Sequence, residues 1–134
     1  MTATIQYEGN LRCSAKHLQS GTSIETDAPT DNRGKGERFS PTDLVCTALG
    51  TCMLTTMAIK ATDMGIELKD TSVDVKKHMV ADPRRIGKID AVVTFPTALG
   101  LDEKDRIILQ RTADHCPVVK SLHPDIELNI EYKW

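Results

Sequence analysis

The stretch that decides the fold is residues 40–64, SPTDLVCTALGTCMLTTMAIKATDM. It opens with the signature of a helix start, in which Ser40 is the N-cap, Pro41 takes the first helical position and Asp43 can accept a hydrogen bond from the N-cap amide. Gly65, directly after the stretch, suits a left-handed C-terminal cap. The pattern predicts a helix of about 24 residues, which is about 36 Å long at 1.5 Å per residue.

Apolar side chains cover nearly every face of this helix instead of a single stripe: Leu44, Val45, Cys46, Ala48, Leu49, Cys52, Met53, Leu54, Met57, Ala58, Ile59 and Ala61. One sheet in a chain of 134 residues cannot bury all of these side chains. We therefore expect a second subunit to cover the remaining faces. The uncharged part, residues 44–59, is shorter than the ~20 apolar residues that cross a bilayer, so we expect no membrane span.

Composition limits the class of protein. With 40% hydrophobic and 27% charged residues, the 134-residue chain is expected to form one globular domain over residues 1–134. Seventeen basic and nineteen acidic side chains are interleaved and give a net charge of −2, and aromatic residues are only 4%. These values predict neither a nucleic-acid nor a membrane partner. The first residues lack the apolar run of a secretory signal, so a cytoplasmic location is expected.

The remaining elements follow from turn residues and periodicity. Gly9-Asn10 is a hairpin turn dipeptide, and Pro117 suits the first position of a short helix whose N-cap is Cys116. Extended segments are expected at residues 3–8, 11–17 and 22–26, in a hairpin of residues 69–81 and 86–96, and at residues 126–132. A loop is expected at residues 27–37, and further helices from about 102 to the residue before Cys116 and from 117 to about 122.

The four cysteines, Cys13, Cys46, Cys52 and Cys116, are the main candidates for chemistry, because thiol chemistry outweighs structural disulfides in a chain without a secretory signal. A helix N-terminus lowers the pKa of a thiol, so Cys116 is expected to be a reactive thiol with a low pKa. Cys52 lies about eleven residues into its helix, so it requires a cation, a hydrogen bond or Cys116 near its sulfur to ionise. Cys46 lies on another face of that helix, and Cys13 is expected to be an ordinary strand residue.

Two other interpretations of the cysteines stay open. A free cysteine is often a small buried hydrophobic residue, so both Cys52 and Cys116 can serve as core packing. A zinc site of Cys52, His115 and Cys116 has the right ligand types, but no Cys-x-x-Cys or His-x-x-x-His spacing supports it. We expect neither a metal nor a cofactor.

Two blocks of sequence resemble the signature of the OsmC/Ohr family. The first runs from Ser40 to Val45 and on through Ala48 to Met53, and the second is residues 115–122, HCPVVKSL. The opening hairpin at residues 7–11 is also similar, so the resemblance spans essentially the whole chain. It implies an α+β fold in which two subunits intertwine, with antiparallel sheets wrapped around long central apolar helices. The match is closer to the less characterised OsmC-like branch.

The resemblance also implies a thiol peroxidase that acts in oxidative stress defence. Cys52 resembles the peroxidatic thiol that attacks an organic hydroperoxide and becomes a sulfenic acid. Cys116 resembles the resolving thiol that converts it to a disulfide, which a dithiol or a lipoylated protein reopens. The expected partners are therefore a second copy of the chain, the hydroperoxide and the dithiol reductant.

One position departs from the peroxidase pattern. Peroxidase members carry a glutamate directly after the residues that correspond to Ser40 and Pro41, where it orients an arginine that activates the thiolate, and here this residue is Thr42. Arg12 and Arg33 are the candidates for the arginine. The alternative function is a non-catalytic dimer of the same fold that binds or senses a small apolar or thiol-reactive molecule at the subunit interface.

Overall fold

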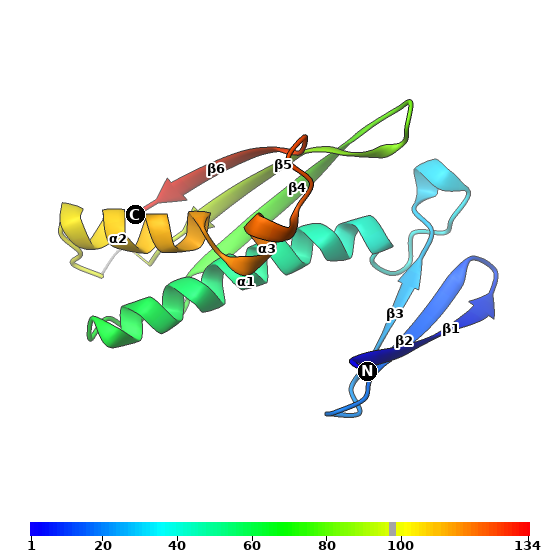
Figure 1. Cartoon of the computed structure of the whole chain (residues 1–134), viewed down its shortest axis with the longest axis horizontal. Coiled ribbons are helices and arrows are strands. Elements are labelled where there is room, and N and C mark those ends of the chain that lie inside the picture. The colour runs from blue at the N-terminus through cyan, green and yellow to red at the C-terminus, as the bar shows by residue number, and fades with distance from the viewer. Residues whose placement is uncertain (97–98) are drawn as a thin grey trace. The chain divides into compact units, whose positions relative to one another are not determined.

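The computed structural model describes residues 1–96 and 99–134. The chain forms two compact units, Met1–Val45 and Cys46–Trp134. Each unit contains one three-stranded sheet, and the helices complete a mixed α+β architecture (Figure 1). The predicted α+β class is confirmed, whereas the single domain over residues 1–134 stays a prediction.

The first unit is an antiparallel sheet in the order β1-β2-β3, with β1 at Ala3–Gly9, β2 at Arg12–His17 and β3 at Ser23–Asp27. The β1–β2 turn needs positive φ angles, which Gly9 (+89°) and Asn10 (+52°) adopt. This confirms the predicted hairpin. The following loop contains a single 3-10 turn, η1, at Thr30–Asn32.

One face of this sheet is apolar and exposed. The strand register brings Ile5, Ala15 and Ile24 into one row and Tyr7 and Cys13 into the next. Ile5 and Tyr7 keep 64% and 63% of their surface exposed, and Ile24 keeps 48%. A single chain therefore leaves this apolar face uncovered, although the cost of exposing it favours a partner.

Helix α1 (Pro41–Asp63) starts and ends as its sequence predicts. The Ser40 N–H donates to Asp43 Oδ2 at 2.8 Å and the Asp43 N–H donates to Ser40 Oγ at 3.1 Å, which is a complete capping box. At the other end Gly65 has φ +72°, and the Ile66 N–H donates to the Ala61 carbonyl at 2.8 Å. These bonds form a Schellman cap.

The second unit holds a sheet in the order β4-β5-β6, with β4 at Ser72–Val80, β5 at Arg85–Thr94 and β6 at Glu127–Lys133. The β4–β5 pair is the predicted antiparallel hairpin. The β5–β6 pair is parallel, so the expectation of purely antiparallel sheets is corrected here. The reason is the crossover between these strands, which contains α2 (Glu103–Asp114) and α3 (Pro117–Ser121).

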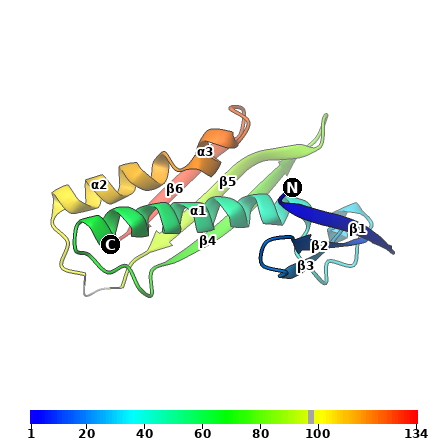
Figure 2. The same ribbon diagram turned by 60° about the horizontal axis from the view of Figure 1, so that its bottom comes forward.

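The helices of this unit pack on one face of the sheet (Figure 2). That face carries the alternate β5 residues Ile89, Ala91 and Val93, which are at most 1% exposed. The core they share with the helices includes the fully buried Leu49, Met53 and Met57 of α1 and Leu109 and Ala113 of α2. The opposite face is polar; for example, His78 Nε2 lies 2.6 Å from Asp90 Oδ2 on the neighbouring strand.

Helix α1 buries one side against its own chain and exposes the other. Ile59 is 68% exposed, and exposed threonines near it bond their hydroxyls to α1 carbonyls, as Thr55 does to Thr51 O at 2.9 Å. Because these hydroxyls are bonded to the helix itself, the exposed side presents Ala48 and Ile59 together with threonines whose hydroxyls already have a partner. By length and mean hydropathy (1.5) alone α1 could cross a membrane, but its other side packs on its own sheet as a core helix does.

The depth of α1 on the sheet depends on Gly50. A Cβ at this position would lie 2.9 Å from Val73 Cγ1 and 3.2 Å from Val75 Cγ1 of β4. We predict that Gly50→Ala lowers the free energy of unfolding by about 1 kcal/mol, because overpacking costs about 1–3 kcal/mol and exceeds the helix-propensity gain of about 0.5–1 kcal/mol. Urea unfolding measures this change. Thr62→Ala, at an exposed α1 position, is the control, and a Gly50→Ala protein as stable as that control would contradict the close packing.

Candidate functional site

Two free thiols from separate elements of the second unit meet at the start of α3. Cys52 lies in the middle of α1 and is half-buried, whereas Cys116 is the N-cap of α3 and is fully buried. The two sulfurs are close enough for the thiol of Cys116 to hydrogen-bond to Cys52. The sequence prediction that Cys52 needs a hydrogen bond or Cys116 nearby matches this geometry.

Neutral donors surround the Cys52 sulfur. Burial raises the pKa of Cys52, but hydrogen bonds from the Val118 N–H, the Cys116 thiol and the Thr56 hydroxyl outweigh it, so the pKa lies below its ordinary value. The Thr56 oxygen lies 3.8 Å from the sulfur, one helical turn further along α1. The Val118 N–H is available because it belongs to the first turn of α3 and has no partner within that helix.

Cys116 has the opposite shift. Burial and the neighbouring Cys52 raise its pKa. Its side chain makes no cap hydrogen bond of ordinary geometry, although the Val119 and Val118 N–H groups offset part of the rise. The N-cap position and Pro117 are as the sequence predicts, but the expected low pKa of Cys116 is wrong. Full burial raises the pKa of Cys116 more than the amides of the helix start lower it, and the Val118 N–H also acts on Cys52.

The phenol of Tyr132 and the carboxylate of Asp114 form a hydrogen-bonded pair near Cys116. Tyr132 Oη on β6 donates to Asp114 Oδ1 at 2.6 Å and lies 3.5 Å from the Gln110 carbonyl. Burial and the neighbouring negative charge raise the pKa of Tyr132 well above its usual range, so this phenol stays protonated. The pair ties the C-terminal turn of α2, and with it the segment that carries Cys116, to the sheet.

The other sequence candidates of this region lie apart from the sulfurs. His115 Nδ1 hydrogen-bonds to the Arg111 carbonyl at 2.8 Å and its ring is exposed, so it bonds to α2 and not to a thiol. Cys46 is buried on α1, and Cys13 lies in the sheet of the first unit. Among residues 1–96 and 99–134 no cluster of three His, Cys, Asp or Glu side chains could hold a metal ion.

The two candidate arginines lie in the first unit and differ in their surroundings. Arg12 forms a two-point ion pair with Asp27 (2.7 and 2.8 Å) and a contact of 2.9 Å with Glu37. Asp27 is buried, and the Arg12 guanidinium lowers its pKa. Arg33 is exposed and ends η1 in the left-handed conformation, with φ +66°. Sequence reasoning did not foresee Asp27 and Glu37 as partners, because they lie 15 and 25 residues from Arg12.

Thr42, at the position of the family glutamate, belongs to the start of α1. Its hydroxyl lies 3.1 Å from Ser40 Oγ, which also caps the helix through Asp43. This side chain is therefore part of the helix cap. The carboxylates that bind Arg12 come from other positions.

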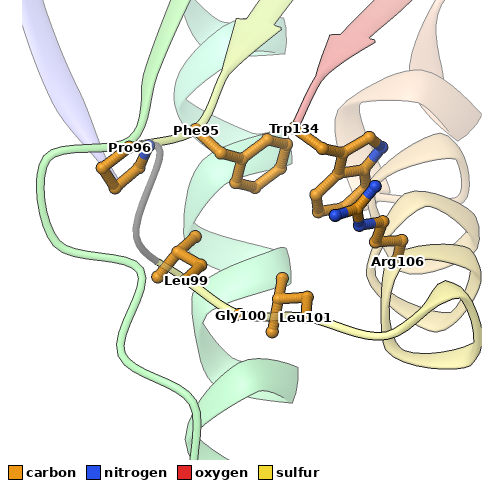
Figure 3. Close-up of a pocket in the computed structure, with 7 residues that line it drawn as sticks. All are labelled: Phe95, Pro96, Leu99, Gly100, Leu101, Arg106 and Trp134. Atoms are coloured by element: carbon orange, nitrogen blue, oxygen red, sulfur yellow. The ribbon is translucent and has the colours of Figure 1, made fainter.

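A small hollow at the other end of the second unit is lined by Phe95, Pro96, Leu99, Gly100, Leu101, Arg106 and Trp134 (Figure 3). The rings of Phe95 and Trp134 stack at 4.0 Å, and Arg106 Cζ lies 5.8 Å from the Trp134 ring centre. The volume of this hollow is ≈ 30 Å³, which suits a water molecule and not an organic substrate. The thiols are therefore the better candidate site.

A family model of OsmC-like proteins matches residues 34–131, which include both cysteine blocks. The chain belongs to the OsmC-like protein family. A solved structure from Psychrobacter arcticus 273-4, provisionally described as an osmotic stress induced and detoxification response protein, is 50% identical. It covers 98% of this chain and 95% of its own, with a TM-score of 0.93. No curated protein matches the sequence.

More distant OsmC-like structures share the fold. The organic hydroperoxide resistance protein OsmC of Legionella pneumophila has 15% identity, covers 100% of this chain and 98% of its own, and has a TM-score of 0.77. The organic hydroperoxide resistance protein OhrB of Bacillus subtilis has 18% identity, 99% and 98% coverage, and a TM-score of 0.66. At these identities the match supports the architecture alone.

The opposite pKa shifts predict an order of reactivity for the two thiols of this OsmC-like protein. At neutral pH iodoacetamide should alkylate Cys52 before Cys116, because the thiolate is the nucleophile and each pKa unit between the thiols gives about a tenfold difference in thiolate. Timed quenching and peptide mass spectrometry measure both rates in one sample. Faster alkylation of Cys116 would contradict the assigned environments.

Proposed function

We propose that this OsmC-like protein is a thiol peroxidase that reduces organic hydroperoxides through Cys52 and Cys116. The observation that carries the proposal is the pairing of two free thiols with opposite pKa shifts on adjoining elements. The names of the Legionella and Bacillus relatives as organic hydroperoxide resistance proteins support the substrate class.

In the first step the Cys52 thiolate attacks one oxygen of the hydroperoxide. An S–O bond forms, the O–O bond breaks, and the alkoxide leaves and takes a proton from solvent to become an alcohol. Cys52 is oxidised to a sulfenic acid while the peroxide is reduced. The neutral donors at the sulfur favour this step because they stabilise the thiolate.

In the second step Cys116 attacks the sulfur of the sulfenic acid. An S–S bond forms, the S–O bond breaks, and the hydroxyl leaves as water with the proton of the Cys116 thiol. The Cys52 thiolate, whose charge helps raise the pKa of Cys116, no longer exists at this stage. Cys116 is thus a weak nucleophile before the peroxide reacts and a better one afterwards.

A dithiol, free or carried by a lipoylated protein, completes the cycle. Its two thiols reduce the disulfide to Cys52 and Cys116 and become a cyclic disulfide themselves. Such a cycle needs a compartment that keeps thiols reduced, which agrees with the expected cytoplasmic location.

The family resemblance also implies an arginine that supports the Cys52 thiolate. Arg12 is the better candidate because Asp27 and Glu37 fix its guanidinium, whereas Arg33 lies on an exposed turn. A fixed guanidinium loses less side-chain entropy when it approaches a thiolate. Arg12→Lys should slow peroxide consumption more than Arg33→Lys.

Single cysteine variants test the roles of the two thiols. Cys52→Ser should abolish consumption of cumene hydroperoxide with dihydrolipoamide as reductant, because it removes the nucleophile. Cys116→Ser should consume one peroxide per site and then stop as the sulfenic acid, which dimedone traps. Cys46→Ser is the matched control, since its thiol lies on the same helix away from the site, and it should turn over normally.

Equal residual turnover in Cys52→Ser and Cys116→Ser would contradict these roles. Absence of peroxide consumption by the unmodified protein, with both thiols still reduced, would favour the alternative of a non-catalytic dimer that binds a small apolar or thiol-reactive molecule. If a variant that lacks both thiols functions like the unmodified protein, Cys52 and Cys116 serve only as core packing.

We also propose that the working form is a homodimer. Two apolar surfaces of one chain support this: the exposed side of α1 with Ala48, Thr51, Thr55 and Ile59, and the Ile5–Tyr7–Ile24 face of the first sheet. A second copy presents the same pair of surfaces, so two chains could cover both at once in a closed symmetric assembly.

Ile59→Lys tests the homodimer. If the exposed side of α1 is a subunit interface, a buried unpaired ammonium there should weaken association strongly, and light scattering at micromolar concentration should show a shift from dimer to monomer mass. Lys60→Gln, the exposed neighbour, should leave the mass unchanged. A monomeric mass for the unmodified protein would remove the proposal.

A further inference from the structure

Four threonines of α1 differ in the direction of their hydroxyls. Thr51, Thr55 and Thr62 each donate to the carbonyl four residues earlier, at 2.9–3.0 Å. This is the usual arrangement for threonine inside a helix. Thr56 differs: its hydroxyl faces the Cys52 sulfur, 3.8 Å away.

We propose that Thr56 is a catalytic residue whose hydroxyl donates a hydrogen bond to the Cys52 thiolate and holds it ionised for attack on the peroxide. The inference rests on the proposed peroxidase function and assigns a residue to it. Thr56 touches the reacting atom itself. Its place in the sequence, four residues after Cys52, puts it one turn further along the same helix.

The direction of this hydrogen bond follows from the chemistry of sulfur. While Cys52 is a thiol, either group can donate. Once Cys52 has lost its proton, the sulfur has only lone pairs, so the Thr56 hydroxyl must be the donor. Hydrogen bonds to an ionised acceptor are about twice as strong as neutral ones, so this contact stabilises the thiolate more than the thiol.

Thr56 matters because the other groups that hydrogen-bond to the Cys52 sulfur are a backbone amide and a thiol, both neutral. They are the Val118 N–H, which belongs to the backbone, and the thiol of Cys116, which is consumed in the second step. Thr56 is therefore the side-chain donor that persists through the cycle. It also lies in the same helix as Cys52, so the helix itself sets the spacing of the two side chains.

The test compares Thr56→Val, which keeps the shape and removes the hydroxyl, with Thr56→Ser, which keeps the hydroxyl. The rate of Cys52 alkylation by iodoacetamide is measured from pH 5 to 10 by peptide mass spectrometry. Thr56→Val should raise the midpoint of the pH–rate profile of Cys52, so that alkylation at neutral pH slows about threefold or more. Thr56→Ser should stay within about twofold of the unmodified protein.

Thr62→Val is the matched control, because its hydroxyl bonds to the Ala58 carbonyl and not to sulfur. Its profile should overlay that of the unmodified protein, and thermal unfolding confirms that all variants fold. If the pH profile of Cys52 alkylation in Thr56→Val is the same as that of the unmodified protein, the inference is overturned.

Consumption of cumene hydroperoxide is measured on the same samples to separate the two claims. A first turnover that is about threefold or more slower in Thr56→Val than in Thr62→Val would support the catalytic role. A shifted alkylation profile in a protein that consumes no peroxide would uphold the hydrogen bond but overturn both the peroxidase and the catalytic role. An unshifted profile in a protein that does consume peroxide would overturn the role of Thr56 alone.

Discussion

The chemistry of this protein depends on the contact between the Cys52 sulfur and the first turn of α3. Pro117 starts α3 and leaves the Val118 and Val119 N–H groups without partners in the helix. One of these amides stabilises Cys52, which lies far from the N-terminus of its own helix. On another face of the same helix, Gly50 lets α1 lie close to β4.

The same contact makes the two thiols unequal. Cys116 is fully buried and its pKa is raised, whereas Cys52 is half-buried and its pKa is lowered by its neutral donors. Two thiols in identical surroundings would compete for the same oxidant. In the proposed cycle this difference assigns the first reaction to Cys52, and the oxidation of Cys52 removes a charge that hinders Cys116.

Much of this arrangement was predictable from local sequence. The capping box at Ser40 and Asp43, the Gly65 cap, and Pro117 with Cys116 as N-cap are short-range signals, and each is confirmed. The parallel β5–β6 pair was not predicted, because strand direction depends on the whole crossover between the strands.

The roles of Cys52 and Cys116 stay a prediction, whereas the electrostatics around them differ from the sequence expectation. Cys52 and Cys116 are close together, as the family resemblance requires, but the expected low pKa of Cys116 is wrong because burial is a tertiary property. The role of the Val118 amide depends on how α3 packs against α1. The spacing of apolar residues in the sequence does not reveal this packing. Thr56 could have been noticed from its spacing of four residues, which places it beside Cys52 on a helix.

The central claim is that a hydroperoxide links Cys52 and Cys116. The most direct measurement is to treat the fully reduced protein with one equivalent of cumene hydroperoxide and map its cysteines by intact and peptide mass spectrometry. The account predicts a loss of two hydrogens and a single cross-linked peptide pair joining Cys52 to Cys116. A stable sulfenic acid on Cys52 with Cys116 still reduced, or a disulfide that involves Cys13 or Cys46, would contradict it.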